Sequence, residues 1–261
     1  MRTSAGSPPA GSSSGPLPYR LIATAAATAV GAAHIVVTGR SVPWTRHVLD
    51  DLGYDGLAVC GQGAQVYDAG THRLLTSVTL DRQLAALALA KIEAEVGPLA
   101  LAASRDGLAG EVLMGEGYVY QPELPVIHMQ DPADLWAEPI NKLYIQHRGG
   151  LDDDTLVEAA QAVAGDLVGV TMAGAGIVEL LPLGLTKATG LSLAARRLGV
   201  TPAETIAFGD MPNDLPMFSW AAHGVAMANA HPELKAVADE VTASNDEDGI
   251  AVVLERFFGP A

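Results

Sequence analysis

The residues best suited to chemistry lie in a short run, Gly-Asp-Met-Pro-Asn-Asp, at positions 209–214. The apolar stretch 205–208 before it predicts a strand, so in a parallel sheet the run would lie at the carboxyl end, where α/β proteins bind ligands. Asp210 offers a hard oxygen of the kind that Mg²⁺ prefers. Asn213 and Asp214 would begin the next helix, able to cap it and to face an anion. A plain capped turn is the alternative for this run taken alone.

Two further positions have the chemistry of a phosphate site. Thr38, Gly39 and Arg40 follow an apolar run that ends at Val37. A hydroxyl and free backbone N–H groups at such a place can hold phosphate oxygens, and glycine permits close approach. Lys187 begins a predicted helix, where an ammonium opposes the helix dipole unless an anion lies between them. The plainer alternatives are an ordinary loop and a solvated lysine, but the three signals together are more specific than any one.

A parallel sheet is needed to position these loops, and the chain has the pattern for it. Short β-branched runs alternate with helical stretches, which is typical of βα units. We expect the following elements: strands at 34–37, 57–60, 205–208 and 224–227, helices at 43–52 and 187–198 and after residue 213, and a hairpin of 66–67 with 74–78.

The middle of the chain predicts a separate α+β insert. Strands are expected at 111–114, 142–146 and 177–181, and helices at 81–96 and 151–164. Leu84, Leu87, Ala88 and Ile92 are expected on one face of the first of these helices. The predicted fold is therefore α/β, with a Rossmannoid parallel-sheet core at 19–80 and 182–261 and an α+β cap at 81–181. Residues 1–18, rich in Ser, Gly and Pro, predict a disordered tail.

Composition limits the classes of partner. Of 261 residues, 49% are hydrophobic and 17% charged, which suits a globular protein. A net charge of −15 without a cluster of Lys and Arg argues against nucleic acid. A small phosphorylated metabolite stays compatible, because such sites use a few local cations and often Mg²⁺. The uncharged stretch 21–37 superficially resembles a membrane span, but Ala and Thr dominate it. We expect no membrane partner and a cytoplasmic location.

Other catalytic chemistries have little support. Cys60 is the only cysteine, so it forms no intrachain disulfide, and we expect it to be a small buried residue. The seven histidines show neither His-x-His nor His-Glu-x-x-His spacing. The Gly-x-Gly sequence at 61–63 begins like a dinucleotide fingerprint but lacks its third glycine, and no nucleophile elbow occurs.

Five motifs together resemble those of Cof-like phosphatases of the haloacid dehalogenase superfamily. They are Ile-Val-Val-Thr-Gly-Arg at 35–40, Gln-Gly-Ala at 62–64, Glu-Leu-Leu-Pro-x-Gly-x-Thr-Lys at 179–187, Gly-Asp-x-x-Asn-Asp at 209–214, and Gly-Val-Ala-Met-Ala-Asn-Ala at 224–230. The match is collinear from about residue 34 to the C-terminus. It implies a cap over the active site and Mg²⁺-dependent hydrolysis of small, sugar-phosphate-like monoesters.

The resemblance also assigns roles to residues. Thr38 and Lys187 would contact the transferring phosphoryl group, Asp210 would ligate Mg²⁺, and Asn213 and Asp214 would complete the surroundings of phosphate and metal. The implied sets are Lys187 and Asp210 for catalysis, Thr38, Gly39, Arg40, Lys187 and Asn213 for phosphate, and Asp210 and Asp214 for the metal. Gln62 stands where the family more often has Asn.

The group that should attack phosphorus is missing. In the family the first core strand ends in Asp-x-Asp-Gly-Thr, whose first Asp is the nucleophile and whose second shuttles a proton. Residues 20–24 resemble that strand, yet Ala-Ala-Ala-Thr-Ala follows, and the first carboxylate of the chain is Asp50. Only ten residues separate Thr24 from Ile35, whereas a parallel crossover needs about a dozen or more. We hypothesise a deletion variant that lost the catalytic loop and the start of the first helix, with residues 25–33 as a remnant.

Three functional readings follow. The first is a Mg²⁺-dependent phosphohydrolase by descent, impaired because the nucleophile is absent. The second is a catalytically inactive protein that binds phosphorylated metabolites through Thr38, Arg40 and Lys187. The third is a truncated or misread product without a selected function. The sequence does not predict the oligomeric state.

Aromatic residues of the cap leave the substrate open. Tyr118, Tyr120, Trp136 and Tyr144 either contact a substrate or pack the interior of the insert, and Trp44 has the same two alternatives.

Overall fold

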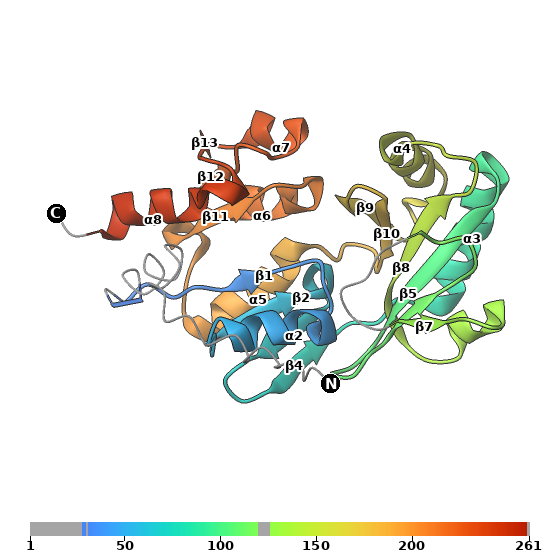
Figure 1. Cartoon of the computed structure of the whole chain (residues 1–261), viewed down its shortest axis with the longest axis horizontal. Coiled ribbons are helices and arrows are strands. Elements are labelled where there is room, and N and C mark those ends of the chain that lie inside the picture. The colour runs from blue at the N-terminus through green and yellow to red at the C-terminus, as the bar shows by residue number, and fades with distance from the viewer. Residues whose placement is uncertain (1–27, 30, 120–125, 260–261) are drawn as a thin grey trace, which may run out of the picture.

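The computed structural model of the chain describes residues 28–29, 31–119 and 126–259. They form two bodies that lie side by side along the long axis, a core and a cap (Figure 1). The predicted tail at 1–18, the expected first strand at 20–24 and Tyr120 lie outside the described residues. Thr28 and Ala29 of the proposed helix remnant are helical, and residues 31–33 are not.

The core combines an N-terminal and a C-terminal part of the chain. The first part holds β1 (Val36–Val37), α2 (Val42–Asp51), β2 (Leu57–Cys60), β3 (Gln65–Asp68) and β4 (Arg73–Ser77). The second holds α5 (Lys187–Leu198), β11 (Ile206–Gly209), α6 (Leu215–Trp220), β12 (His223–Ala226), α7 (Pro232–Val237), β13 (Glu240–Val241) and α8 (Gly249–Phe258).

Parallel pairing brings the predicted loops to strand ends. β1 pairs in parallel with β2, and β11, β12 and β13 form a parallel sheet of their own, while β2, β3 and β4 are antiparallel. Within the described residues the two sheets are separate, and side-chain packing joins them. Ile35 and Val37, next to and in β1, contact the cluster that contains Leu191, Ala207 and Phe218.

The cap is a six-stranded sheet covered on one face by two helices. Its strands run in the order β7 (Ile127–His128), β6 (Val112–Met114), β5 (Leu99–Arg105), β8 (Ile140–His147), β10 (Ile177–Leu181) and β9 (Gly169–Gly174). The helices are α3 (Arg82–Val96) and α4 (Asp153–Ala164), and their apolar faces share one buried cluster with the sheet. Asp81 and Asp152 cap them by accepting backbone N–H groups.

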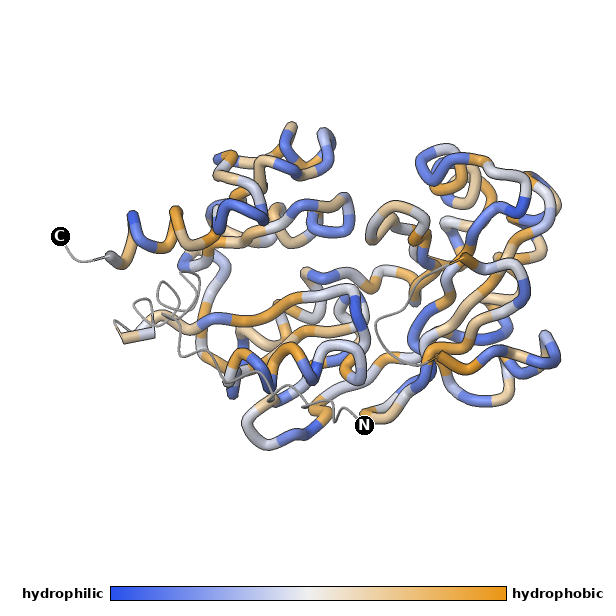
Figure 2. The backbone as a smooth tube through the Cα atoms, in the orientation of Figure 1, coloured by the Kyte–Doolittle hydropathy of each residue, from blue (hydrophilic) through white to orange (hydrophobic). Residues whose placement is uncertain are grey.

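Apolar residues concentrate in the strands of both bodies, as Figure 2 shows by hydropathy. In the cap sheet, alternate residues face opposite sides. Leu143 and Ile145 of β8 face the helices, whereas Lys142 and Tyr144 line a pocket against the core. One face of the sheet therefore builds the interior of the cap, and the other is available to the site.

The α/β prediction with a parallel-sheet core and a cap is confirmed, but it missed four strands, the short β7 and β13 and the longer β5 and β9. α5 and β2 match the predicted ranges residue for residue. β5 and β9 were not predicted, because Leu-Ala-Leu-Ala-Ala-Ser-Arg is rich in alanine and β9 begins and ends with glycine, and both residues have weak strand propensity. The domain boundaries at 81 and 181 stay a prediction.

The predicted apolar face of α3 is right at two of its four positions. Ala88 and Ile92 are buried as expected, but Leu84 and Leu87 are 42% and 49% exposed, and Ala85 and Leu89 are buried in their place. Ala or Leu occupies every position from 84 to 90, so the helical period does not distinguish one face from another.

Among the described residues, no helix combines the length and apolar character needed to cross a membrane.

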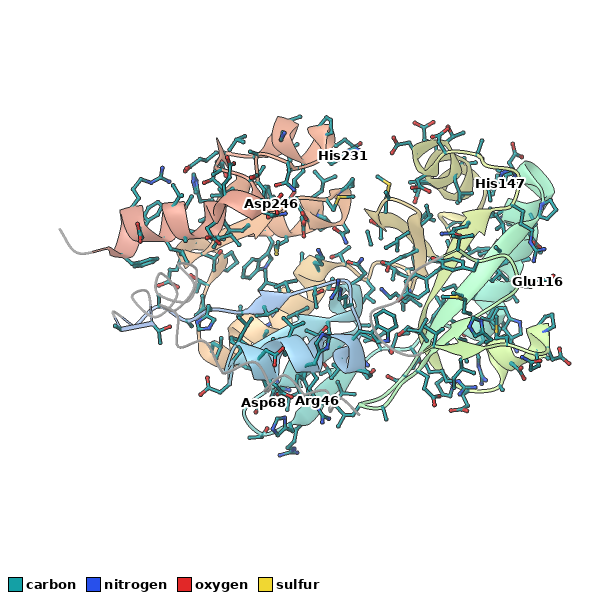
Figure 3. All side chains as sticks on the ribbon, in the orientation of Figure 1. Arg46, Asp68, Glu116, His147, His231 and Asp246 are labelled. Carbon is teal, nitrogen blue, oxygen red and sulfur yellow. The ribbon has the colours of Figure 1, made fainter. Side chains whose placement is uncertain are left out.

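The histidine in β8, His147, has a structural role and is labelled in Figure 3. Its Nε2 lies 2.8 Å from the carbonyl oxygen of Val96, and its Nδ1 accepts the N–H of Leu151 at 3.0 Å.

We predict that Cys60 is inert in the native protein. Its side chain is fully buried in β2, and burial raises the pKa of the thiol to about 12. At pH 8 the thiol therefore stays protonated and out of contact with solvent, and a chromogenic disulfide reagent should react only after denaturation, with one thiol per chain. Rapid reaction of the native protein would contradict this placement.

Candidate active site

The loop after β1 has donors arranged for an anion. The N–H of Thr38 donates to the carbonyl of Val59 at 2.8 Å, and that of Gly61 donates to the carbonyl of Arg40 at 2.8 Å, which fixes both ends of the loop. The Thr38 hydroxyl oxygen accepts the N–H of Arg40 at 3.1 Å, so its own proton is left to donate. The N–H of Gly39 has no acceptor among the described residues. Thr38 and Gly39 thus offer two donors to one pocket.

Lys187 reaches this pocket from the first turn of α5. Thr186 caps the helix, its hydroxyl accepting the N–H of Thr189 at 3.3 Å. Two glycines let α5 approach the turn after β2. A Cβ on Gly190 would lie 2.7 Å from the Cα of Gly63, and a Cβ on Gly63 would lie 2.1 Å from the carbonyl oxygen of Thr186. Any side chain there would displace α5, and Lys187 with it.

The loop after β11 holds Lys187 in place. Its Nζ donates to Oδ1 of Asp214 at 2.6 Å and to Oδ1 of Asn213 at 3.2 Å. The other oxygen of Asp214 accepts the N–H groups of Asp210 and Met211 at 3.0 and 3.2 Å. Lys187 and Asp214 are 7% and 3% exposed. An ammonium has three protons, so one remains for a ligand in the pocket.

A buried hydrogen-bond chain continues from this loop into the cap. Nδ2 of Asn213 donates to Oε1 of Gln62 at 3.2 Å, and Nε2 of Gln62 donates to Oε2 of Glu179 on β10 at 2.5 Å. The other oxygen of Glu179 is paired with Lys142 on β8, whose Nζ also donates to the carbonyl of Gly39 at 2.6 Å. The side chains of Lys142 and Glu179 are both 1% exposed. Cap and core are thus joined by charged groups that water does not reach.

Gln62 has an uncommon backbone conformation at the centre of this chain. Its φ of 61° lies in the left-handed region, which costs a non-glycine residue about 1–3 kcal/mol. Its side-chain amide bonds Asn213 and Glu179 at once, and a Cβ on Gly39 would lie 2.6 Å from Nε2. The surrounding contacts therefore hold the conformation. The backbone N–H of Gln62 also donates to the carbonyl of Thr38 at 3.3 Å.

Lys142, Glu179, Lys187 and Asn213 border one pocket of about 360 Å³ between core and cap. Figure 3 draws the side chains of both bodies around this region. The predicted site residues that line the pocket are Thr38, Gly39, Arg40, Lys187, Asp210 and Asn213. Asp214 does not line it and lies behind Lys187, to which it is bonded. The fold thus brings together residues that are up to 176 positions apart in the chain, Thr38 and Asp214.

The described residues supply only part of a magnesium site. Oδ2 of Asp210 accepts the side-chain amide of Asn245 at 2.9 Å, and its other oxygen has no hydrogen-bond partner within the described residues. Asp214 would have to give up Lys187 or a backbone N–H group to bind a metal. No group of three or more His, Cys, Asp or Glu side chains able to hold a metal occurs in the described ranges. This donor set does not fit a tightly held ion.

The sequence prediction missed two site residues, Lys142 and Glu179. Each is a charged residue in the middle of an apolar strand, Ile140–His147 and Ile177–Leu181. Such residues are almost never fully buried unless they are paired. A lysine and a glutamate, each within an apolar strand, could therefore have been predicted from the sequence to form a buried ion pair.

We predict that Lys142→Met lowers the free energy of unfolding by about 3–5 kcal/mol, because Glu179 would stay buried without its ion partner. Chemical denaturation of the full chain measures this loss. Changing Glu179→Leu in the same chain should restore part of it, since no unpaired charge is then left.

Lys91→Met is the matched control, because the Lys91–Asp166 pair spans 3.8 Å with side chains 44% and 74% exposed. Such a pair contributes about 1 kcal/mol or less. Equal losses for the two lysine variants would contradict the prediction that the buried Lys142–Glu179 pair matters more for stability than an exposed one.

Comparison with known proteins identifies the family of the chain. The model of the haloacid dehalogenase-like hydrolase family matches residues 18–254. The chain is 35% identical to the stress response protein YhaX of Bacillus subtilis over 155 residues, which are 56% of this chain, and it spans about half, 52%, of that relative's length.

A second relative is aligned over most of both chains. The 5-amino-6-(5-phospho-D-ribitylamino)uracil phosphatase YwtE of Bacillus subtilis is 29% identical over 247 residues, 85% of this chain and 84% of that protein. Among solved structures, SMU.1108c from Streptococcus mutans UA159 matches with a TM-score of 0.79 at 21% identity. The match covers 93% of this chain and 91% of that chain, which shows a shared fold. The resemblance to the Cof-like branch is confirmed, and the chain belongs to the haloacid dehalogenase-like hydrolases.

Proposed function

We propose that the pocket binds small phosphate monoesters and that the chain is a phosphohydrolase by descent whose hydrolysis is impaired. The observation that carries this proposal is the convergence of the Thr38 hydroxyl, the Gly39 N–H and the Lys187 ammonium on one pocket. These are the kinds of donor that hold phosphoryl oxygens. Arg40, exposed and also lining the pocket, adds positive charge.

Magnesium would bind at Asp210 and only weakly without a substrate. Mg²⁺ in proteins is often held by one or two carboxylates together with substrate phosphate and water. Asp210 provides one such carboxylate, and the ester would provide further oxygens. When bound, the ion would neutralise charge on the phosphoryl group.

Apart from Asp210, which we propose as a magnesium ligand, the acidic residues in or near the pocket are poor replacements for the missing nucleophile. Glu179 lines the pocket, but Lys142 and Gln62 engage both of its oxygens. Asp214 is likewise committed to Lys187 and two backbone N–H groups. Asp50 is the first acidic residue of the chain and does not line the pocket. The pocket therefore supports binding better than covalent catalysis.

The alternative is a protein that binds phosphorylated metabolites and does not turn them over. The same three donors support it, because none of them depends on a nucleophile. A small metabolite rather than nucleic acid or a membrane would be the partner, and a cytoplasmic location remains our expectation.

Reading the encoding DNA around codons 24 and 25 would show whether the absence of the Asp-x-Asp-Gly-Thr motif is native.

We predict that turnover of p-nitrophenyl phosphate is at background with or without Mg²⁺. Losing a nucleophile that acts as a unit with its acid/base partner can cost about a millionfold in turnover. Steady-state release of p-nitrophenol is the measurement, with Asp210→Asn as the control for contaminating phosphatase. Mg²⁺-dependent turnover that disappears in Asp210→Asn would exclude an inactive protein.

We predict that inorganic phosphate raises the thermal unfolding temperature of the wild-type chain, because a ligand that binds only the folded state stabilises it. Thr38→Val removes one donor to the anion and should weaken phosphate binding about tenfold. Thr76→Val, on the hairpin strand β4 and outside the pocket, is the matched control and should respond like the wild type. No shift in any of the three would favour a product without a selected function.

A further inference from the structure

The loop after β1 has a hydrogen-bond donor for each of its three carbonyl oxygens. The carbonyls at its two ends, those of Thr38 and Arg40, accept backbone N–H groups of the turn after β2 at 3.3 and 2.8 Å. The middle carbonyl, that of Gly39, accepts Nζ of Lys142 at 2.6 Å, and Lys142 lies on strand β8 of the cap. Among the described residues, the core therefore holds the two ends of the loop and the cap holds its middle.

Lys142 thereby fixes the peptide unit between Gly39 and Arg40. A trans peptide unit is planar, with its C=O and N–H groups on opposite sides. The carbonyl of this unit faces Lys142, and its N–H, that of Arg40, donates to the hydroxyl oxygen of Thr38 at 3.1 Å. This bond leaves the hydroxyl proton of Thr38 free to donate to an anion. Two hydrogen bonds and one rigid unit therefore connect the cap lysine with the Thr38 hydroxyl.

Glycine at position 39 makes this support necessary. Glycine has no Cβ, so its backbone has more conformational freedom than that of any other residue. If the peptide unit turned over, the carbonyl oxygen of Gly39 would face the Thr38 hydroxyl and accept its proton. A larger residue does not fit, because a Cβ on Gly39 would lie 2.6 Å from Nε2 of Gln62. The donor geometry of the loop therefore depends on a hydrogen bond from another part of the chain.

The ammonium group of Lys142 is already occupied, which distinguishes it from Lys187. It donates to the Glu179 carboxylate and to the Gly39 carbonyl, and its Nζ lies over the Tyr144 ring, 4.7 Å from the centroid. The side chains of Lys142 and Glu179 are both 1% exposed, and the carboxylate balances the charge of the lysine. Lys142 is therefore placed to act on the loop and not on a bound anion.

We propose that Lys142 is a positioning residue for phosphate. It holds the Gly39 carbonyl towards the cap and leaves the Thr38 hydroxyl free to donate, so it raises the affinity for the anion without contacting it. This rests on the proposed binding of phosphate monoesters. It gives the buried Lys142–Glu179 pair a role in binding besides its role in stability.

Isothermal titration of the full chain with inorganic phosphate, in the presence of Mg²⁺, tests this. Lys142→Met combined with Glu179→Gln removes both charges, and the amide carbonyl at position 179 can still accept the bond from Gln62. The carbonyl of Gly39 then loses its donor. We expect this double variant to bind phosphate about tenfold more weakly than the wild type.

Asn141→Leu is the matched control, on the same strand and also 1% exposed. Asn141 donates to the carbonyl of Val78 at 2.8 Å and accepts Nε2 of Gln65, on core strand β3, at 3.3 Å, and it does not line the pocket. The control should lower the free energy of unfolding and keep the phosphate affinity of the wild type. Equal weakening of phosphate binding by Asn141→Leu would make Lys142 a general support of the cap and overturn the proposal.

Thr38→Val tests the route of the effect. If Lys142 acts through the Thr38 hydroxyl, adding Lys142→Met and Glu179→Gln to Thr38→Val should cost clearly less than a further tenfold, because the group that they position is already gone. Fully additive losses, about a hundredfold in all, would show that Lys142 acts on phosphate independently of Thr38 and is not a positioning residue.

Failure of this inference and failure of the proposed function give different results. If the wild type binds inorganic phosphate and the Lys142→Met, Glu179→Gln variant binds it equally well, the positioning role is wrong and the proposed function stands. If the wild type does not bind inorganic phosphate, the proposed function fails and this inference fails with it.

Discussion

Two buried ion pairs and the amides between them set the geometry of the site. Lys142 and Glu179 belong to the cap, Lys187 and Asp214 belong to the core, and Gln62 and Asn213 connect them. A charge removed from water is tolerated only when it is paired and hydrogen-bonded. Movement of the cap away from the core would break the bonds of Gln62 to Glu179 and of Lys142 to Gly39. The buried charges therefore stabilise the arrangement of Figure 1, in which the cap lies beside the core.

The same chain of contacts would hold the proposed anion site without the family's first motif. Its members come from residues 39–214, after the stretch of sequence that lacks this motif. The loop after β1 is fixed by β2 and Lys142, and Lys187 is fixed by Asp214 and Asn213. The proposed phosphate donors are therefore held by contacts among described residues that do not use the missing motif.

The core residues of the candidate site could be selected from the sequence because each lies in a local motif, and the structure brings most of them to one pocket. Lys187 and Asp210 each lie within a loop or first turn next to a recognisable strand or helix, and parallel strands place such loops at one edge. The cap side was missed, because the pairing of Lys142 with Glu179 depends on the register of β8 against β10. A single sequence does not specify that register.

Where local propensity was weak, the structure was decided by packing. β5 is rich in alanine, yet it lies between β6 and β8 and pairs with both. In α3, Leu84 is exposed while Ala85 is buried, because Ala85 lies with Leu89 and Ile92 on the face that packs against the sheet. Tertiary contacts override intrinsic preference in both cases.

Phosphorus NMR of a phosphate monoester with a stoichiometric amount of protein and Mg²⁺ reports binding and hydrolysis at once. If the pocket is intact and the attacking group absent, the ester resonance shifts or broadens on addition of protein, and no inorganic phosphate accumulates. An unchanged ester resonance would contradict the pocket. Growth of an inorganic phosphate signal that depends on Asp210 would contradict the loss of the attacking group.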